Sequence, residues 1–146
     1  MDQDSRHSVS VAGVIVDDQG RALLIQRRDN GHWEAPGGVL ELNEDIISGL
    51  RREVQEETGL EIEPELLTGV YKNMKHGIVA LVFRCHITGG SLVVTDESKA
   101  FRWVTADEAR VLSVQAFAIR VLDALAGTGY PAVREHDGVR ILGAGI

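Results

Sequence analysis

The chain has 146 residues, of which 44% are hydrophobic and 25% charged, an ordinary composition for a globular protein with one buried core. Its formal net charge of −7 argues against general binding to nucleic-acid polymers or membrane surfaces, and no apolar run is long enough to span a bilayer. The N-terminus lacks the apolar core of a signal peptide, and Cys85 is the single cysteine. We therefore expect a protein of the reducing cytoplasm.

The first part of the chain predicts a β-hairpin and a glycine-rich loop. Residues 9–16 (VSVAGVIV) and 22–28 (ALLIQRR) are rich in apolar side chains and are joined by the turn sequence DDQG. Residues 29–38 (DNGHWEAPGG) contain Asn-Gly, Pro-Gly and Gly-Gly, which is typical of a loop.

A helix follows, and we predict that it begins with Asn43 as its N-cap and ends at Gly59, a residue that suits a left-handed terminus. Its apolar stripe recurs every four residues and consists of Ile46, Leu50 and Val54. Gly49 inside this helix costs about 1 kcal/mol relative to alanine. Either a neighbouring group packs closely against Gly49, or glycine is simply tolerated there.

The second half of the chain predicts further strands and two helices. The strands cover residues 63–72, 77–87, 91–94 and 101–104. The helices cover residues 106–112, after a capping box formed by Thr105 and Glu108, and 114–126. The tail from 127 to 146 has no assigned role. Its end, VRILGAGI, is either a last strand or a segment that contacts a partner.

The order of strands, helix, strands and helix favours an α+β fold, with a mixed central sheet between helices. No Gly-x-Gly-x-x-Gly follows a strand, which disfavours a doubly wound dinucleotide-binding fold. We expect one domain over residues 1–146, with a core from about 9 to 125.

Three glutamates, Glu53, Glu56 and Glu57, stand at the C-terminal end of the predicted helix. That end carries the negative pole of the helix dipole, and their spacing brings the side chains together on one face. Nine acidic and two basic residues between positions 41 and 65 give this segment a local charge of −7. Such crowding costs stability unless a cation joins it. Hard carboxylate oxygens predict Mg²⁺ as the cation, with Mn²⁺ as an alternative.

Residues 38–60 (GVLELNEDIISGLRREVQEETGL) resemble the signature of the Nudix hydrolases, the MutT-like pyrophosphohydrolases. The specified positions are Gly38, Glu44, Arg52, Glu53, Val54, Glu56, Glu57, Gly59 and Leu60. The wider resemblance runs from about residue 9 to 125. It implies a Nudix-type α/β/α sandwich and hydrolysis of a nucleoside diphosphate linked to a further group.

The resemblance also implies roles for residues of the signature. Glu56 and Glu57 are the first-choice metal ligands, and Glu53 is a further ligand or the base that activates water. Glu44 and Arg52 are expected to orient these carboxylates without binding the metal themselves.

Two groups outside the signature are expected to complete the metal site. One is a loop carbonyl at Gly37. The other is an acid from a later loop, for which Glu97 is the first candidate and Asp96 the second.

Candidate substrate contacts are Arg27, which could reach phosphate, and the aromatic rings of Trp33 and Tyr71, which could stack on a base. Trp33 also suits a purely structural role in its loop.

The default substrate is a nucleoside triphosphate, with ADP-ribose or a nucleotide sugar as alternatives. A nucleotide-sensing or interaction module without turnover is the second class of function. We expect a small-molecule nucleotide as partner, no nucleic-acid polymer and no membrane, and a homodimer is compatible with the sequence.

Overall fold

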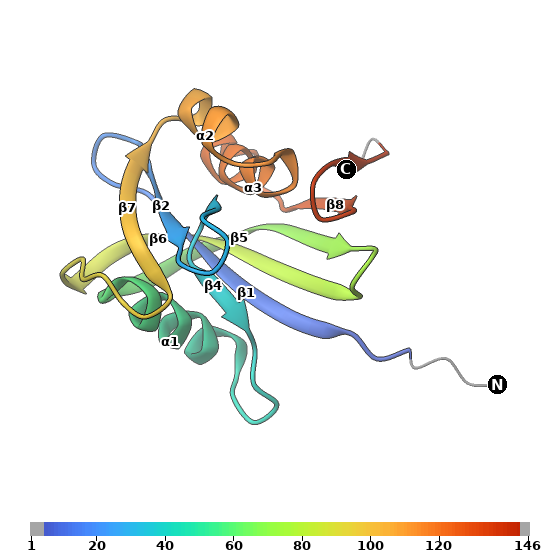
Figure 1. The fold of residues 1–146 in the computed structure, drawn as a ribbon, viewed down its shortest axis with the longest axis horizontal. Coiled ribbons are helices and arrows are strands. Elements are labelled where there is room, and N and C mark those ends of the chain that lie inside the picture. The colour runs from blue at the N-terminus through green and yellow to red at the C-terminus, as the bar shows by residue number, and fades with distance from the viewer. Residues whose placement is uncertain (1–4, 144–146) are drawn as a thin grey trace.

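Two β-sheets lie between α1 on one side and α2 with α3 on the other in the computed structural model, which describes residues 5–143 (Figure 1). In chain order the elements are β1 (Ser8–Ile15), β2 (Ala22–Arg27), β3 (Trp33–Glu34), β4 (Gly37–Val39), α1 (Ile46–Thr58), β5 (Leu60–Asn73), β6 (Ile78–Gly90), β7 (Ser98–Val104), α2 (Ala106–Leu112), α3 (Gln115–Ala126), β8 (Ala132–His136) and β9 (Ile141–Leu142). No helix within residues 5–143 is both long enough and apolar enough to cross a membrane.

The larger sheet is mixed and has the strand order β4-β1-β6-β5-β8-β9. Strand β1 runs parallel to β6, and β5 runs parallel to β8, whereas the other neighbours are antiparallel. The smaller sheet, β3-β2-β7, is antiparallel throughout. The predicted α+β fold with a mixed central sheet is therefore confirmed.

Strand β1 separates two hydrophobic cores because its successive side chains point to opposite faces of the sheet. Val11 and Ile15 pack in the core that contains Leu50 and Val54 of α1. Val14 packs in the other core, which contains residues of α3. Burial on both faces explains why this strand reads as a nearly continuous apolar run.

Helix α1 begins later than the sequence predicted. Its N-cap is Asp45, whose Oδ1 accepts a hydrogen bond of 2.8 Å from the backbone N–H of Ser48. Asn43 was therefore the wrong N-cap, and Ile46 is 41% exposed and not part of the core stripe. Gly49 is buried, and a Cβ there would lie 2.4 Å from Cδ1 of Leu40. A side chain at that position would have to displace the ends of the Leu40 and Glu44 side chains, so close packing favours glycine there.

One segment of the second half differs from expectation, and the tail, which had no assigned role, forms strands. Residues 91–94 do not form a strand, since they pass the end of α1, where the N–H of Val93 bonds to the carbonyl of Thr58. The tail contains β8, which extends the main sheet beside β5. Within VRILGAGI, Ile141–Leu142 is a short strand, and residues 144–146 lie outside the described residues.

Candidate active site

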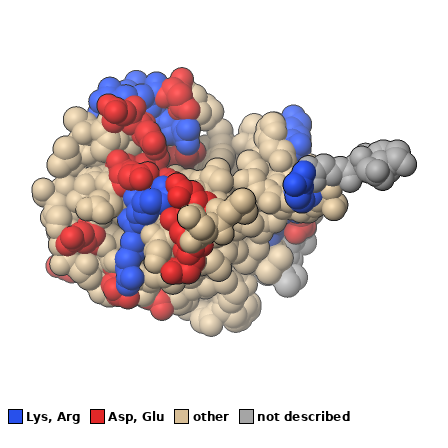
Figure 2. Space-filling view, turned by 90° about the horizontal axis from the view of Figure 1, so that it is seen from below, with Lys and Arg blue, Asp and Glu red and all other residues tan. Residues whose placement is uncertain are grey.

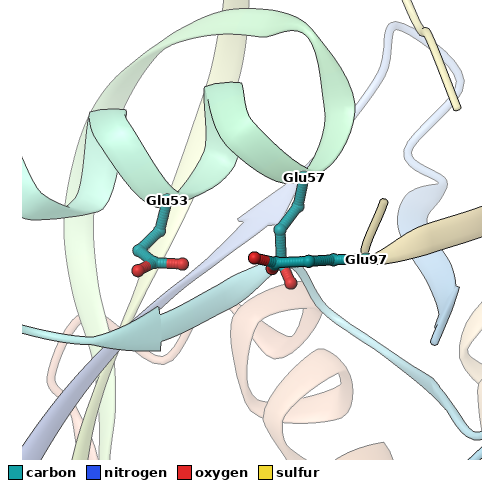
Figure 3. A group of neighbouring side chains, drawn as sticks. All are labelled: Glu53, Glu57 and Glu97. Carbon is teal, nitrogen blue, oxygen red and sulfur yellow. The ribbon is translucent and has the colours of Figure 1, made fainter. Parts of the chain in front are cut away.

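Helix α1 places Glu53 and Glu57 one turn apart on the side that packs toward β4 (Figure 3). Oε1 of Glu57 accepts a hydrogen bond of 2.6 Å from the backbone N–H of Gly37. A Cβ at Gly38 would lie 2.3 Å from Oε2 of Glu53, so any side chain at that position would displace the carboxylate. The close approach of strand and helix therefore fixes both glutamates.

A third carboxylate reaches the same place from a distant part of the chain. Glu97 lies in the loop before β7, and its side chain points to the carboxylate of Glu57 (Figure 3). Ligand oxygens of Glu53, Glu57 and Glu97 all lie within 4.8 Å of one another. We call these three residues the carboxylate cluster. Only hard oxygen donors are present in it, which is the donor set that Mg²⁺ and Mn²⁺ prefer.

The electrostatics of the carboxylate cluster favour an added cation. Burial, together with the neighbouring Glu97 and Glu53, raises the pKa of Glu57 to about 8 against the opposing effect of the Gly37 N–H. Burial also raises the pKa of Glu53, although Arg52 opposes the shift. Ionising all three groups is therefore unfavourable until positive charge arrives, and the residues present fit a divalent cation.

Arg52 connects the carboxylate cluster to the start of α1. Its Nη2 and Nε donate to the two carboxylate oxygens of Glu44 at 2.6 and 2.9 Å, and its Nη1 donates to Oε1 of Glu53 at 2.9 Å. This arginine lowers the pKa of Glu44 to about 2. Basic side chains surrounded by acidic ones are visible on the α1 side of the molecule (Figure 2). The fork of Arg52 thus holds Glu53 in one orientation.

A pocket of about 320 Å³ adjoins the carboxylate cluster. Gly37 and Gly38 of β4 line this pocket and also contact the glutamates of α1, so the two features meet at that strand. Phe117 and Arg120 of α3 and His136 of β8 form part of the opposite wall. Glu53, Glu57 and Glu97 do not themselves line the pocket, so the pocket and the carboxylate cluster are neighbours only through β4.

A profile of the NUDIX domain family matches residues 6–125. The chain belongs to the NUDIX domain family. It is a Nudix hydrolase, an enzyme that acts on acid anhydrides, and nucleoside diphosphate-linked compounds are its substrate class. The resemblance read from residues 38–60 is thereby confirmed.

Relatives of this Nudix hydrolase include a MutT-like protein of Streptomyces ambofaciens, 56% identical over 139 residues, which cover 95% of this chain and 90% of that protein. The human 8-oxo-dGDP phosphatase NUDT18 is 40% identical over 93 residues, and an ADP-ribose pyrophosphatase of Methanocaldococcus jannaschii is 34% identical over 99 residues. These two matches cover 62% and 63% of this chain, but 28% and 58% of the relatives.

Solved structures confirm the Nudix fold. The crystal structure of a MutT Nudix hydrolase from Burkholderia pseudomallei matches with a TM-score of 0.71 at 29% identity, over 81% of this chain and 98% of that one. An ADP-ribose pyrophosphatase from Streptococcus suis matches with a TM-score of 0.74 at 20% identity, over 90% of this chain and 100% of that one.

Within the Nudix signature, Glu56 differs in position from the other acids. Its side chain is 51% exposed and accepts a hydrogen bond of 3.2 Å from Arg52, and it does not belong to the carboxylate cluster. Gly37 contacts the cluster through its N–H, whereas the prediction concerned its carbonyl. A ligand role for Glu56 and for the Gly37 carbonyl therefore stays a prediction.

The predicted substrate contacts of the Nudix hydrolase separate into two groups. Arg27 lines the pocket, although it is also paired with Asp29 and Glu34 at 2.7 and 3.0 Å. Trp33 does not line the pocket and packs partly buried against the core, where its carbonyl accepts a hydrogen bond from Ser113. This position of Trp33 suits a structural role.

Tyr71 was wrongly expected to stack on a base. The side chain is 0% exposed in the core, and its hydroxyl donates to Oδ2 of Asp123 at 2.6 Å. No face of this ring is open to a ligand, because Arg120 lies over it with Cζ 5.2 Å from the ring centroid. The sequence reading missed Arg120 itself, as well as Phe117 and His136. The apolar periodicity of α3 gives no signal that its polar side faces a pocket.

A pH dependence of stability follows from the raised pKa of Glu57. A carboxyl with a pKa of about 8 in the folded state and about 4.5 in the unfolded state keeps its proton only when folded. Between these values the unfolded state has lost the proton, so the free energy of unfolding falls as pH rises from about 4.5 to 8. We expect the melting temperature of the metal-free protein to fall over this window.

This dependence is measured by thermal unfolding in EDTA, for the wild type and for Glu57→Gln. In Glu57→Gln the melting temperature should fall less steeply with pH, because the amide does not titrate. The amide can still accept the Gly37 hydrogen bond. Glu61→Gln is the matched control, because Glu61 is exposed and outside the carboxylate cluster. An equally steep fall in Glu57→Gln would contradict the assignment.

Proposed function

We propose that this protein is a Mg²⁺-dependent pyrophosphohydrolase whose default substrate is a nucleoside triphosphate. The observation that carries the proposal is the convergence of Glu53, Glu57 and Glu97 beside a pocket of nucleotide size. The carboxylate cluster, with Glu56 as a fourth acid, would hold the metal. When bound there, Mg²⁺ would supply neutralisation of phosphate oxygens and of the leaving group.

The side chains divide the remaining work. Glu53 takes a proton from the attacking water, whose oxygen forms a new bond to phosphorus as the bridging P–O bond breaks. Arg52 holds the carboxylate of Glu53 by the 2.9 Å hydrogen bond and is itself fixed by Glu44. Glu57 is anchored by the N–H of Gly37. Arg27 lies at the pocket, where it can neutralise phosphate.

A second candidate substrate class comes from the relatives. The Methanocaldococcus jannaschii protein is named an ADP-ribose pyrophosphatase, and the human relative is named an 8-oxo-dGDP phosphatase. ADP-ribose and oxidised guanine nucleotides therefore belong in any substrate screen.

Turnover of a nucleotide panel tests the proposal. Nucleoside triphosphates, diphosphates, 8-oxo-dGDP, ADP-ribose and nucleotide sugars are incubated with Mg²⁺, and the phosphate-containing products are quantified. We expect hydrolysis of at least one triphosphate, abolished by EDTA and restored by excess Mg²⁺. Hydrolysis in H₂¹⁸O identifies the phosphorus that is attacked. Tight binding of nucleotides without any turnover would instead favour the sensing module.

A further inference from the structure

Two hydrogen-bond donors that belong to pocket-lining residues are buried without partners. Nε of Arg120 and Nε2 of His136 are both inaccessible to solvent, and neither forms a hydrogen bond within the described residues. Buried polar atoms are almost always paired in folded proteins, because an unpaired donor loses its hydration without compensation. Both side chains line the pocket beside β4, so a ligand there is the natural source of the missing acceptors.

Arg120 has an unusual environment for a guanidinium. It lies between two aromatic rings, with Cζ 4.6 Å from the centroid of Phe117 and 5.2 Å from that of Tyr71. No carboxylate in residues 5–143 forms an ion pair with it, and the nearby Glu34 is instead paired with Arg27. The rings hold the guanidinium in place, and its Nε–H has no acceptor within the described residues.

His136 is a donor at its free nitrogen. The residue is 1% exposed, and its Nδ1 accepts a hydrogen bond of 2.9 Å from the N–H of Gly138. Burial and the nearby Arg120 lower the pKa of His136, so the neutral ring predominates at pH 7. Because Nδ1 accepts in the neutral ring, the proton resides on Nε2. Arg120 and His136 therefore both require acceptor atoms on a ligand.

Apart from Arg27, which is paired with Glu34, the rest of the pocket suits a base better than a phosphate. Its remaining wall includes the apolar side chains of Ala12, Ala35, Ile78 and Ala80, which suit an apolar ring. The carboxylate of Glu34 also lines the pocket and would repel a second anion. The polyanionic part of a nucleotide has its own place at the carboxylate cluster.

We propose that Arg120 and His136 read the acceptor edge of a keto-bearing nucleobase, so that guanine-like and uracil-like bases are bound in preference to adenine and cytosine. Guanine presents O6 and N7 as acceptors to an arginine fork, and uracil-type bases present O4. Adenine and cytosine place an amino donor at the equivalent position, where it meets another donor. This inference rests on the proposed nucleotide hydrolysis and disfavours adenine compounds such as ADP-ribose.

A comparison of ITP with ATP tests the contact with this edge of the base, because the base of ITP carries a 6-oxo group where the base of ATP carries a 6-amino group. We expect the wild type to hydrolyse ITP with a kcat/KM about 5- to 150-fold higher than ATP, the range for a bidentate base contact. In Arg120→Met the ratio should fall to within about threefold of unity. Arg120→Lys should retain part of the preference, because an ammonium donates without the fork.

Arg110→Met is the matched control for folding and charge. Arg110 lies on the exposed side of α2 outside the pocket. We expect the ratio of kcat/KM for ITP to that for ATP in Arg110→Met to equal the wild-type ratio. An equal loss of kcat/KM for both nucleotides in Arg120→Met would assign Arg120 to phosphate or ribose and overturn the inference. A wild-type ratio near unity, or a preference for ATP, would overturn it as well.

Binding separates this inference from the hydrolytic function. The dissociation constants of ITP and ATP are measured calorimetrically with Mg²⁺ on Glu53→Gln and on the double variant with Arg120→Met. Tighter binding of ITP that Arg120→Met abolishes supports base recognition even if no nucleotide is turned over. Equal affinities alongside normal wild-type hydrolysis would overturn base recognition and leave the proposed function intact. No binding of either nucleotide would also overturn it.

Discussion

Replacing Glu53 with glutamine is expected to lower kcat by at least about 10²-fold, because the variant lacks the carboxylate that we propose as the base that takes the proton from water. Glutamine keeps the size of the side chain and can still accept the hydrogen bond from Arg52. The fold should therefore remain, and the loss should appear in kcat rather than in the affinity for the nucleotide. Single-turnover rates and calorimetric binding measure the two effects separately.

Two comparisons make the Glu53 result specific. Glu61→Gln removes the same charge from an exposed position and should retain the wild-type kcat. Raising the pH should accelerate a weak residual reaction in Glu53→Gln if hydroxide replaces the missing base. Wild-type turnover in Glu53→Gln would remove this residue from the mechanism.

Replacing Arg52 with lysine is expected to lower kcat/KM by about 10- to 100-fold, the usual effect of losing a group that orients metal-binding side chains. Lysine preserves the charge, but a single ammonium cannot reproduce the simultaneous contacts of Arg52 with both oxygens of Glu44 and with Glu53. The Mg²⁺ concentration needed for half-maximal activity should rise in parallel. Titration of Mg²⁺ at saturating nucleotide measures this shift.

Arg51→Lys is the matched control for Arg52→Lys. Arg51 is the preceding residue of α1, and its partner Glu63 is half exposed on the surface. Exposed ion pairs contribute little to stability, so Arg51→Lys should leave kcat/KM and the Mg²⁺ requirement unchanged. A Mg²⁺ titration in Arg52→Lys that coincides with the wild type would contradict the positioning role of Arg52.

The acidic end of α1 was predictable from sequence because helical geometry is local. Glu53 and Glu57 are four residues apart, and that spacing alone places both carboxylates on one face. Gly38 was identified by its place in the signature, and the structure supplies the physical reason, which is the close approach of Glu53. The contribution of Glu97 depended on family resemblance, since no local rule brings residue 97 to residue 57.

The start of α1 was mispredicted because Asn43 and Asp45 are both competent caps. The structure selects Asp45, and Glu44 then precedes the helix and turns back to Arg52 and to the N–H of Glu41. A helix that began two residues earlier would include Glu44 in its first turn. The start of the helix at Ile46 thus goes together with the contact between Glu44 and Arg52, which the local sequence does not reveal.

The pocket could not be predicted, because distant pairings build it. Tyr71 is buried beneath Arg120 of α3, and His136 reaches the pocket through the parallel pairing of β8 with β5. In the sequence, Arg120 is one polar residue in an amphipathic helix, and such residues usually face solvent. Only the folded arrangement reveals that both side chains line one cavity.

His136 lies beyond residue 125, where the match to the NUDIX domain ends. The tail thus supplies part of the wall of the pocket, while the carboxylate cluster comes from α1 and the loop before β7. We therefore expect substitutions in the segment after α3 to change which ligand the pocket binds while they leave the geometry of the carboxylate cluster unchanged.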